Sequence, residues 1–367
     1  MVTNRKIYIV KIRQFKSKMS FLKKLSIGIL CAASMLAPAS SYAKDIDVKR
    51  VHITSCVNDE PCTEENKDVR IEDRVRLNLV VEADIDGRKT YFSESDDVEL
   101  NGRRLKTRKP GDLEAAVRWY KVEPAKNSYN NMKSEKFSWD TPSYTENLIW
   151  DVNSWTISAD AHPTNTEKDV NGGAGTMRYK AEIVHDGKVY ASPGKESKNK
   201  TGVNDKVHRI TFRNGDDFVG WLSAYFNVPY IYGSAGANGS HQTDRFVGAD
   251  CADLVIGACR KSGGNLPYTN ASGLKNFSDT VVEQSGLETD DGGFYRRGGR
   301  KLGYGTDVKT GDLILFGDWH VGVLMEDANA NGVLDRDDLM LHTLFNLPNN
   351  TPIWDYNGFS VLRLKCR

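Results

Sequence analysis

Residues 247–259 read Val-Gly-Ala-Asp-Cys-Ala-Asp-Leu-Val-Ile-Gly-Ala-Cys and predict a loop that turns into a buried helix. Gly248 and Asp250 are typical of a loop and a helix N-cap, and apolar residues then recur at helical spacing. Cys251 is therefore predicted in the first turn, where free backbone N–H groups and the helix dipole stabilise a thiolate. The structural alternative is a small buried residue, because free cysteine is among the most buried residue types.

Two histidines downstream favour the catalytic interpretation. Residues 311–316 and 320–325 predict two buried strands with His320 at the start of the second, and residues 339–344 predict a third that carries His342. Antiparallel pairing would bring both histidines to one face of a sheet, against the helix that begins near Cys251. There His320 would take the thiol proton and His342 would orient the imidazole. Either histidine alone is more typical of a structural residue.

These motifs resemble the catalytic domain of the NlpC family of papain-like cysteine peptidases and amidases. The resemblance spans roughly residues 205–367 and rests on Pro-Tyr-Ile-Tyr-Gly at 229–233, Asp250-Cys251, Gly-Asp-Leu-Ile-Leu-Phe at 311–316, His-Val-Gly-Val at 320–323 and His342. It implies helices packed on an antiparallel sheet and cleavage of an amide or peptide bond through a thioester. Bacterial cell-wall peptides are the substrate class that it implies.

Carried over by position, the resemblance implies a role for four residues. Cys251 would be the nucleophile, His320 the general base and His342 the orienting residue. Tyr230 would line the nucleophile's pocket and help the oxyanion site, together with the backbone N–H of Cys251. Ala252 and Asp253 stand where family members usually carry serine and glycine.

Residues 327–338 follow the spacing of a calcium-binding loop and resemble dockerin-type loops. The expected ligands are five side chains and one backbone carbonyl, contributed by Asp327, Asn329, Asn331, Val333 (carbonyl), Asp335 and Asp338. Zinc suits these hard oxygen ligands less well. Because the loop lies between the strands of His320 and His342, bound Ca²⁺ would have a structural role. The alternative is an acidic hairpin that binds nothing.

The first half of the chain predicts an all-β domain. Apolar residues alternate with polar ones over 75–83, and Asx-Gly pairs at 86–87, 101–102 and 186–187 predict tight turns. An antiparallel sandwich, immunoglobulin-like among the candidates, fits this pattern. The polar stretch 192–202 predicts a linker. We therefore expect an α+β protein with a β-sandwich-like domain over 44–200 and the NlpC-type domain over 205–367.

The N-terminus predicts export. Lys23 and Lys24 precede an apolar run over 25–37 and the small-x-small sequence Ser41-Tyr42-Ala43. This order is typical of a secretory signal peptide over 1–43, cleaved near Ala43, with Met19 as an alternative start. The apolar run is short for a transmembrane anchor. The mature chain is expected in the periplasm or outside the cell.

Cysteine spacing and charge complete the prediction. Of six cysteines, Cys31 lies in the predicted signal, which leaves five. Cys56 and Cys62 bracket a short loop and are the favoured disulfide, and Cys259 with Cys366 can form a second, which would leave Cys251 as the free thiol. The chain carries 50 Lys and Arg against 49 Asp and Glu. This balance gives no argument for a nucleic-acid partner.

Two functions compete at this point. The first is an exported cysteine hydrolase that cleaves cell-wall peptides with Cys251, His320 and His342. The second is an exported binding or effector protein whose cysteine site is inactive or differently specific. In either case the β-domain would engage a wall polymer or a protein partner.

Overall fold

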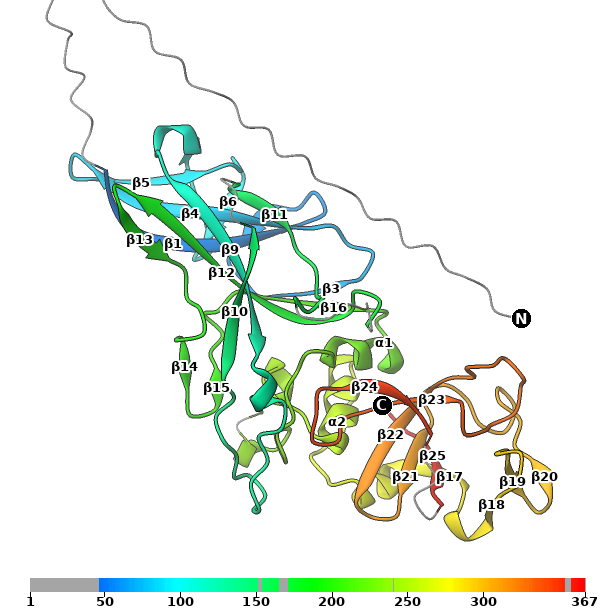
Figure 1. Cartoon of the computed structure of the whole chain (residues 1–367). Helices are drawn as coiled ribbons and strands as arrows, with labels where there is room; N and C mark the ends of the chain where they lie inside the picture. Colours follow the sequence, from blue (N-terminus) through cyan, green and yellow to red (C-terminus); the bar gives the residue numbers. More distant parts are fainter. Residues whose placement is uncertain (1–45, 151–153, 165–170, 240, 354–357, 367) are drawn as a thin grey trace, which may run out of the picture. The chain divides into compact units, whose positions relative to one another are not determined.

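The computed structural model describes residues 46–150, 154–164, 171–239, 241–353 and 358–366, and they are mainly β-strand (Figure 1). Strands make up 43% of the structure and helical segments 13%. The prediction of an α+β fold with a helix-packed C-terminal domain is therefore wrong. The predicted signal peptide lies outside the described residues.

Two sheets build the first half of the described chain. One contains, in spatial order, β7 (Arg103–Arg104), β6 (Val98–Leu100), β2 (Cys62–Thr63), β1 (Ile46–Val57), β4 (Val75–Ile85), β5 (Arg88–Ser93) and β8 (Thr107–Arg108), with β11 (Thr156–Ser158) paired to β4. The other contains β10 (Tyr144–Trp150), β9 (Ala116–Pro124), β12 (Gly175–His185), β16 (Arg209–Arg213) and β3 (Lys67–Arg70), with β13 (Lys188–Ala191) paired to β12. Strand β16, which follows residue 205, thus lies in a sheet of the first half.

Apolar residues from both sheets share one buried cluster. Leu77 and Leu79 of β4 and Trp119 of β9 are fully buried in it, as expected for strands with one face turned to a core. Trp155 is also buried there. These two tryptophans are therefore core residues and do not form an exposed platform for sugar rings.

The second half is organised around a six-stranded antiparallel sheet. Its order is β17 (Ser278–Val282), β25 (Ser360–Leu364), β21 (Leu313–Phe316), β22 (His320–Glu326), β23 (Leu339–His342) and β24 (Asn349–Pro352). Smaller sheets pair β14 (Lys198–Asn199) with β15 (Gly202–Val203), and β18 (Leu287–Thr289), β19 (Tyr295–Arg297) and β20 (Arg300–Lys301) with one another. Helix α2 (Cys251–Lys261) packs against β22 (Figure 1).

Helices are short for identifiable reasons. Helix α1 (Phe218–Leu222) passes after a single turn into the 3₁₀ turn η3 (Ser223–Tyr225). The Ser223 hydroxyl donates to the carbonyl of Gly220 at 2.7 Å, a local bond that competes with helix continuation, and Pro229 follows. The remaining 3₁₀ turns are η1 (Pro110–Asp112), η2 (Lys126–Ser128), η4 (Ala237–Gly239), η5 (Thr243–Arg245), η6 (Ser272–Phe277) and η7 (Gln284–Gly286).

Residues 272–282 form no α-helix. They make the turn η6 and then strand β17, which pairs with β25. Thr280, Val281 and Val282 are β-branched, and such residues fit a pleated surface better than a helix. Pairing with β25 therefore determines the secondary structure of this segment.

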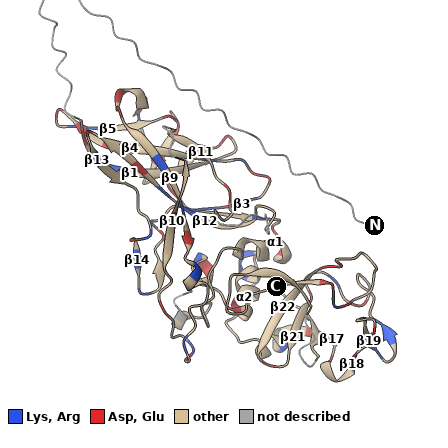
Figure 2. Cartoon of the chain, in the orientation of Figure 1, with Lys and Arg blue, Asp and Glu red and all other residues tan. Residues whose placement is uncertain are grey.

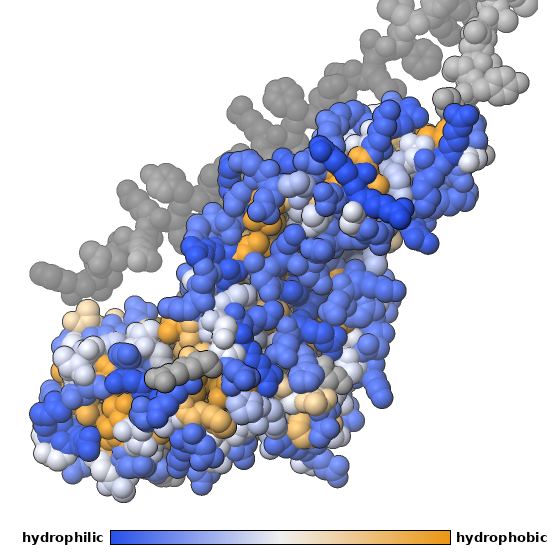
Figure 3. All heavy atoms as spheres, turned by 180° about the vertical axis from the view of Figure 1, so that it is seen from behind, coloured by the Kyte–Doolittle hydropathy of each residue, from blue (hydrophilic) through white to orange (hydrophobic). Residues whose placement is uncertain are grey.

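Both predicted disulfides are confirmed. Cys56 is bonded to Cys62 and Cys259 to Cys366, and Cys251 is the free cysteine of the described residues. None of the described helices is long and apolar enough to cross a membrane. Acidic and basic residues mix along both halves (Figure 2), and the face seen in Figure 3 is mostly hydrophilic with separate apolar patches.

Candidate active site

Cys251 is the first residue of α2, and the residue before it fixes the start of the helix. The Asp250 carboxylate accepts hydrogen bonds from the backbone N–H groups of Ala252 and Asp253, each at 2.9 Å. This cap satisfies two of the free N–H groups at the helix start. The N–H of Cys251 makes no bond within the helix and stays available to a developing oxyanion.

The Cys251 side chain lies against the strand that begins with His320. The thiol is within hydrogen-bonding reach of the backbone N–H of Val321, the residue that follows His320. Helix α2 packs against β22 over this region. The start of α2 and the start of β22, which are far apart in the sequence, thus lie against each other.

His320 and His342 form a hydrogen-bonded pair between neighbouring strands. The Nε2 of His320 lies 2.8 Å from the Nδ1 of His342, whose Nε2 lies 2.9 Å from the Thr351 hydroxyl. Antiparallel pairing of β22 with β23, and of β23 with β24, produces this row. The Nδ1 of His320 is buried and has no hydrogen-bond partner in the described structure.

One tautomer arrangement of the row leaves His320 able to accept a proton. If His320 donates its Nε2–H to His342, and His342 donates its Nε2–H to Thr351, the Nδ1 of His320 keeps a free lone pair. That atom is then a proton acceptor that has no hydrogen-bond donor in the described structure. A buried acceptor on the strand against which the helix of Cys251 packs is a candidate general base.

Burial keeps the resting site neutral. It lowers the pKa of His320 to about 3 and that of His342 to about 4. Burial also raises the pKa of the Cys251 thiol, and the neighbouring Asp250 carboxylate raises it further. The prediction of a thiolate at the helix start is therefore wrong, because desolvation and a nearby negative charge outweigh the helix dipole.

Tyr230 lies beside the nucleophile, where the sequence motif predicted it. Residue 230 forms a bridge with Ala249, two residues before Cys251, and its side chain is 4% exposed. Burial raises the pKa of its hydroxyl, and the proximity of Asp250 and Cys251 adds to the effect. The first half of the chain supports this position, because the backbone N–H of Asn131 donates to the Tyr230 carbonyl at 3.0 Å.

Besides Thr351, two further residues complete the surroundings. Trp319 stacks on His320 with ring centroids 5.4 Å apart, and Phe345 meets Tyr230 edge-on at 5.3 Å. Both are exposed, Trp319 by 56% and Phe345 by 48%. Phe345 also has a φ of 55°, which a bulky residue rarely adopts outside constrained sites. Exposed aromatic rings thus flank the buried Cys251 and His320.

Sequence reasoning missed these three residues. Thr351 stands in a polar stretch that ends at Pro352 and predicts a loop, so nothing indicated that it would contact His342. Phe345 offered no signal either. Trp319 could have been found, because it directly precedes His320 in the turn between two predicted strands.

Asp253, two residues after Cys251, has a structural role. Its Oδ2 accepts from the backbone N–H of Ser234 at 2.6 Å and from the Ser234 hydroxyl at 3.0 Å. Together with Asp250 it completes a capping box at the start of α2. Burial raises the pKa of both carboxyls, and the charge of Asp250 adds to this rise at Asp253. Asp253 thus ties the 233–234 loop to the helix of Cys251.

The predicted calcium loop folds its oxygen ligands toward one another. The amides of Asn329 and Asn331 donate to the Asp335 carboxylate at 2.9 and 2.6 Å, and the Asp327 carboxylate accepts from the backbone N–H of Asn331 and Gly332. Asp338 is fully buried, and burial together with the charges of Asp335 and Asp327 raises its pKa to about 6. Among the described residues no group of three or more His, Cys, Asp or Glu side chains is arranged to hold a metal ion, so calcium binding by this loop stays a prediction.

This loop is attached to its surroundings through Leu334. Leu334 is fully buried, and its backbone N–H donates to the carbonyl of Leu302 at 2.8 Å. The N–H of Tyr295 in β19 donates in turn to the Leu334 carbonyl at 3.0 Å. The loop therefore connects β22 and β23, which carry the two histidines, to the small β18–β20 sheet.

The geometry gathers Cys251, His320, His342 and Tyr230 into one cluster and sets the calcium loop apart on the hairpin between the histidine strands. Comparisons of the chain with protein-family models, with curated proteins and with solved structures found no match.

Proposed function

We propose that the protein is an exported cysteine hydrolase that cleaves an amide or peptide bond, of the kind carried out by the NlpC family. The observation that carries this proposal is the hydrogen-bonded pair of His320 and His342 on the strands beside α2, with the Cys251 thiol in reach of the backbone N–H of Val321, the residue after His320.

The chemistry starts from a neutral pair. As the Cys251 sulfur attacks the carbonyl carbon, the Nδ1 of His320 takes the thiol proton, and His342 stabilises the imidazolium through Nε2. The backbone N–H of Cys251 and the Tyr230 hydroxyl are the candidate donors to the oxyanion. His320 then protonates the leaving amine, and water cleaves the thioester to release the acid and restore the thiol.

Peptides of the bacterial cell wall are the proposed substrate class. The signal-peptide pattern before residue 44 and two disulfides support a periplasmic or secreted enzyme, because disulfides persist in oxidising compartments. Trp319 and Phe345 offer apolar surface on either side of the cluster. Ala252, in place of the serine that family members usually carry after the cysteine, supports a specificity different from that of typical family members.

A structural calcium ion is part of the proposal. Asp327, Asn329, Asn331, Val333, Asp335 and Asp338 would hold it. Bound calcium would neutralise carboxylates that face one another between β22 and β23. The ion takes no part in the reaction and acts by holding the hairpin of the two histidines.

Purified muropeptides test the activity directly. We expect the full chain to release a peptide fragment, detected by mass spectrometry, and Cys251→Ala to release none. Cys259 is not a useful control because it forms a disulfide, so Ser262→Ala, at the far end of α2, serves as the matched variant. Turnover by Cys251→Ala equal to that of the unaltered chain would contradict the proposal.

One observation favours the alternative, a binding or effector protein with an inactive or differently specific cysteine site. Cys251 is only 8% exposed, so a substrate must reach the thiol through a narrow opening or after local movement. A peptide library offered with the wall fragments separates the alternatives. Cleavage of other peptides, with wall fragments left intact, supports different specificity, whereas no cleavage supports the binding role.

A further inference from the structure

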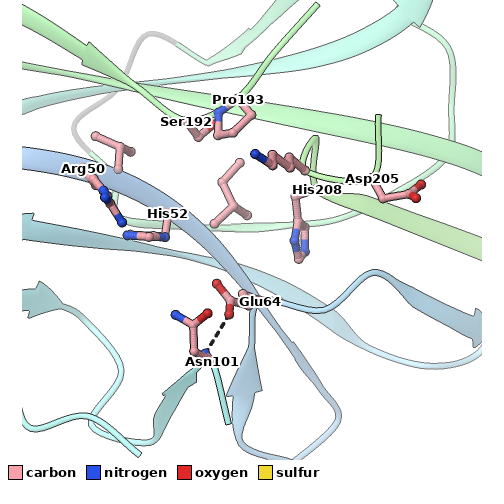
Figure 4. Close-up of a pocket in the computed structure, with 11 residues that line it drawn as sticks. Arg50, His52, Glu64, Asn101, Ser192, Pro193, Asp205 and His208 are labelled. Atoms are coloured by element: carbon pink, nitrogen blue, oxygen red, sulfur yellow. Dashed lines mark hydrogen bonds between the residues drawn. The ribbon is translucent and has the colours of Figure 1, made fainter. Parts of the chain in front are cut away.

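A cavity of about 530 Å³ opens in the first half of the chain and shares no residue with the cluster around Cys251 (Figure 4). We call it the β1 pocket. It lies between β1 and two segments that follow β13, and its lining comprises Arg50, Val51, His52, Ile53, Glu64, Asn101, Ser192, Pro193, Asp205, Lys206 and His208. Its volume is within the range of about 300–1,000 Å³ that small-molecule sites occupy.

Strand β1 presents an unpaired edge to this pocket. On one side β1 pairs with β4 along its length, whereas on the other side only Ser55 pairs, with Thr63 of β2. The backbone of Arg50–Ile53 therefore has no strand partner on the pocket side among the described residues. An open strand edge can pair with the main chain of a peptide, which a sugar or an inorganic ion lacks.

His208 supplies a buried acceptor. The residue is 5% exposed, and its ring donates a hydrogen bond to the backbone carbonyl of Glu64. Its Nε2 has no partner, so the donor is Nδ1 and the free nitrogen carries a lone pair. Burial lowers the pKa of His208 to about 4, which keeps this lone pair free at neutral pH.

Charged side chains of both signs lie around His208, and three of them form no ion pair with a described residue. The Glu64 carboxylate accepts from the backbone N–H of Asn101 at 2.7 Å and forms no ion pair with a described residue. Arg50 and Lys206 line the pocket with exposed cationic side chains, and neither has an anionic partner in the described part of the chain. Figure 4 shows Arg50 and His52 on β1, with Glu64 and His208 across from them.

This lining matches a ligand with two opposite charges. An ammonium group can donate to His208 and Glu64, while a carboxylate can bind Arg50 and Lys206. The lining contains no Phe, Tyr or Trp, and the apolar walls are Val51, Ile53 and Pro193. Sugar sites ordinarily use aromatic faces, so the lining favours a peptide over a saccharide.

We propose that the β1 pocket binds a short peptide with a free amine and a free carboxylate, held by Glu64 and His208 at one end and by Arg50 and Lys206 at the other. The main chain of the peptide would pair with the open edge of β1. This site is separate from the cysteine cluster and does not require that the protein be a hydrolase.

Binding of the dipeptide alanyl-alanine to the full chain carrying Cys251→Ala tests the proposal without any turnover. We expect titration calorimetry to detect binding, and nitrogen-15 spectra to show a shift of the His208 ring. Acetylation of the amine or amidation of the carboxylate should weaken binding at least about tenfold, because each removes a charge-assisted contact.

Variants locate the two ends. Arg50→Ala and Lys206→Ala should each weaken alanyl-alanine about tenfold and leave the amidated peptide unaffected. Lys188→Ala, an exposed lysine of β13 outside the pocket, is the control and should bind as the parent does. Since these are surface positions, circular dichroism should show unchanged folding.

Three results would overturn the proposal. They are no shift of His208 at saturating dipeptide, equal affinity for the blocked and free peptides, or binding of N-acetylglucosamine at the same residues in place of the dipeptide. Failure of the chain to cleave muropeptides leaves this proposal intact, because binding is measured on a chain without the Cys251 thiol.

Discussion

Polar groups are paired and neutral in the cluster around Cys251, whereas several in the β1 pocket are charged and unpaired among the described residues. In the cluster, two imidazoles and a hydroxyl are joined in one row, His320 to His342 to Thr351, and burial keeps them neutral. In the β1 pocket, Arg50 and Lys206 stay charged, exposed and without anionic partners in the described structure. The cluster is thus organised before a substrate arrives, whereas the pocket depends on its ligand for neutralisation.

The difference follows from what each place has to do. A general base must have one fixed tautomer and little competing water, which calls for burial and a hydrogen-bonded neighbour. A recognition site gains specificity from charges that meet partners only in the ligand. Four experiments test whether the two regions really differ in this way.

The largest effect is expected from breaking the row of histidines. His342→Ala should lower kcat about 10²–10⁴-fold, because His320 would lose the group that holds its tautomer and stabilises its charged form. Thr351→Val, which removes only the far end of the row, should cost about tenfold. Steady-state hydrolysis of a muropeptide measures both, and equal activity of His342→Ala and the parent would show that the row has no catalytic role.

Calcium should stabilise the hairpin that carries the row. At a hundredfold excess over its Kd, an ion that binds only the folded state adds about 2.7 kcal/mol, or roughly 5 °C in Tm. Differential scanning calorimetry with calcium and with chelator measures this shift. Asp338→Asn should remove it, whereas Asp337→Asn, at a non-ligand position of the same loop, should keep it. No shift in the parent chain would exclude the loop as a calcium site.

Acid should destabilise the protein through its buried neutral histidines. Unfolded histidine takes up a proton below pH 6.5, whereas folded His208 does so only near pH 4. Unfolding therefore binds a proton in this window, and stability falls as pH falls. His208 alone should account for about 2 kcal/mol between pH 7 and 5. Urea titrations should give His208→Asn a flatter pH dependence than the parent, and parallel curves would contradict the assigned burial.

The smallest effect concerns the reactivity of the thiol. Asp253→Asn removes a carboxyl whose ionised form raises the pKa of Cys251. Because burial raises the pKa of Asp253 itself, the fall in the Cys251 pKa and the faster alkylation should be clearest at the alkaline end of the pH series. The rate of iodoacetamide labelling against pH measures the change. Asp291→Asn, on an exposed turn, is the control. Slower labelling of Asp253→Asn, with its fold intact, would reverse the electrostatic interpretation.

Some features of the site could be predicted from local pattern. The helix that begins at Cys251, the strands that carry His320 and His342, and the position of Tyr230 all follow from short motifs. Each depends on a few neighbouring residues, such as the N-cap Asp250. The Cys56–Cys62 disulfide was predicted from the short loop between the two residues, whereas Cys259–Cys366 was only one possible second pair.

Other features could not be predicted because they depend on residues far away. The strand at 278–282 exists through pairing with 360–364, and Thr351 reaches His342 only because β24 joins the sheet beside β23. The predicted thiolate failed for the same reason. The helix start is visible in the sequence, but the desolvation of Cys251 by the packed sheet is not.

By itself the sequence determined which groups this protein can use: one free thiol, two histidines on neighbouring strands, a loop of oxygen ligands and two disulfides. Only the tertiary structure decided the predominance of strands, the neutral state of the cluster and the open edge of β1 beside unpaired charges. Local propensities and spacing act over a few residues, whereas burial, strand pairing and pKa depend on what the rest of the chain packs against each group.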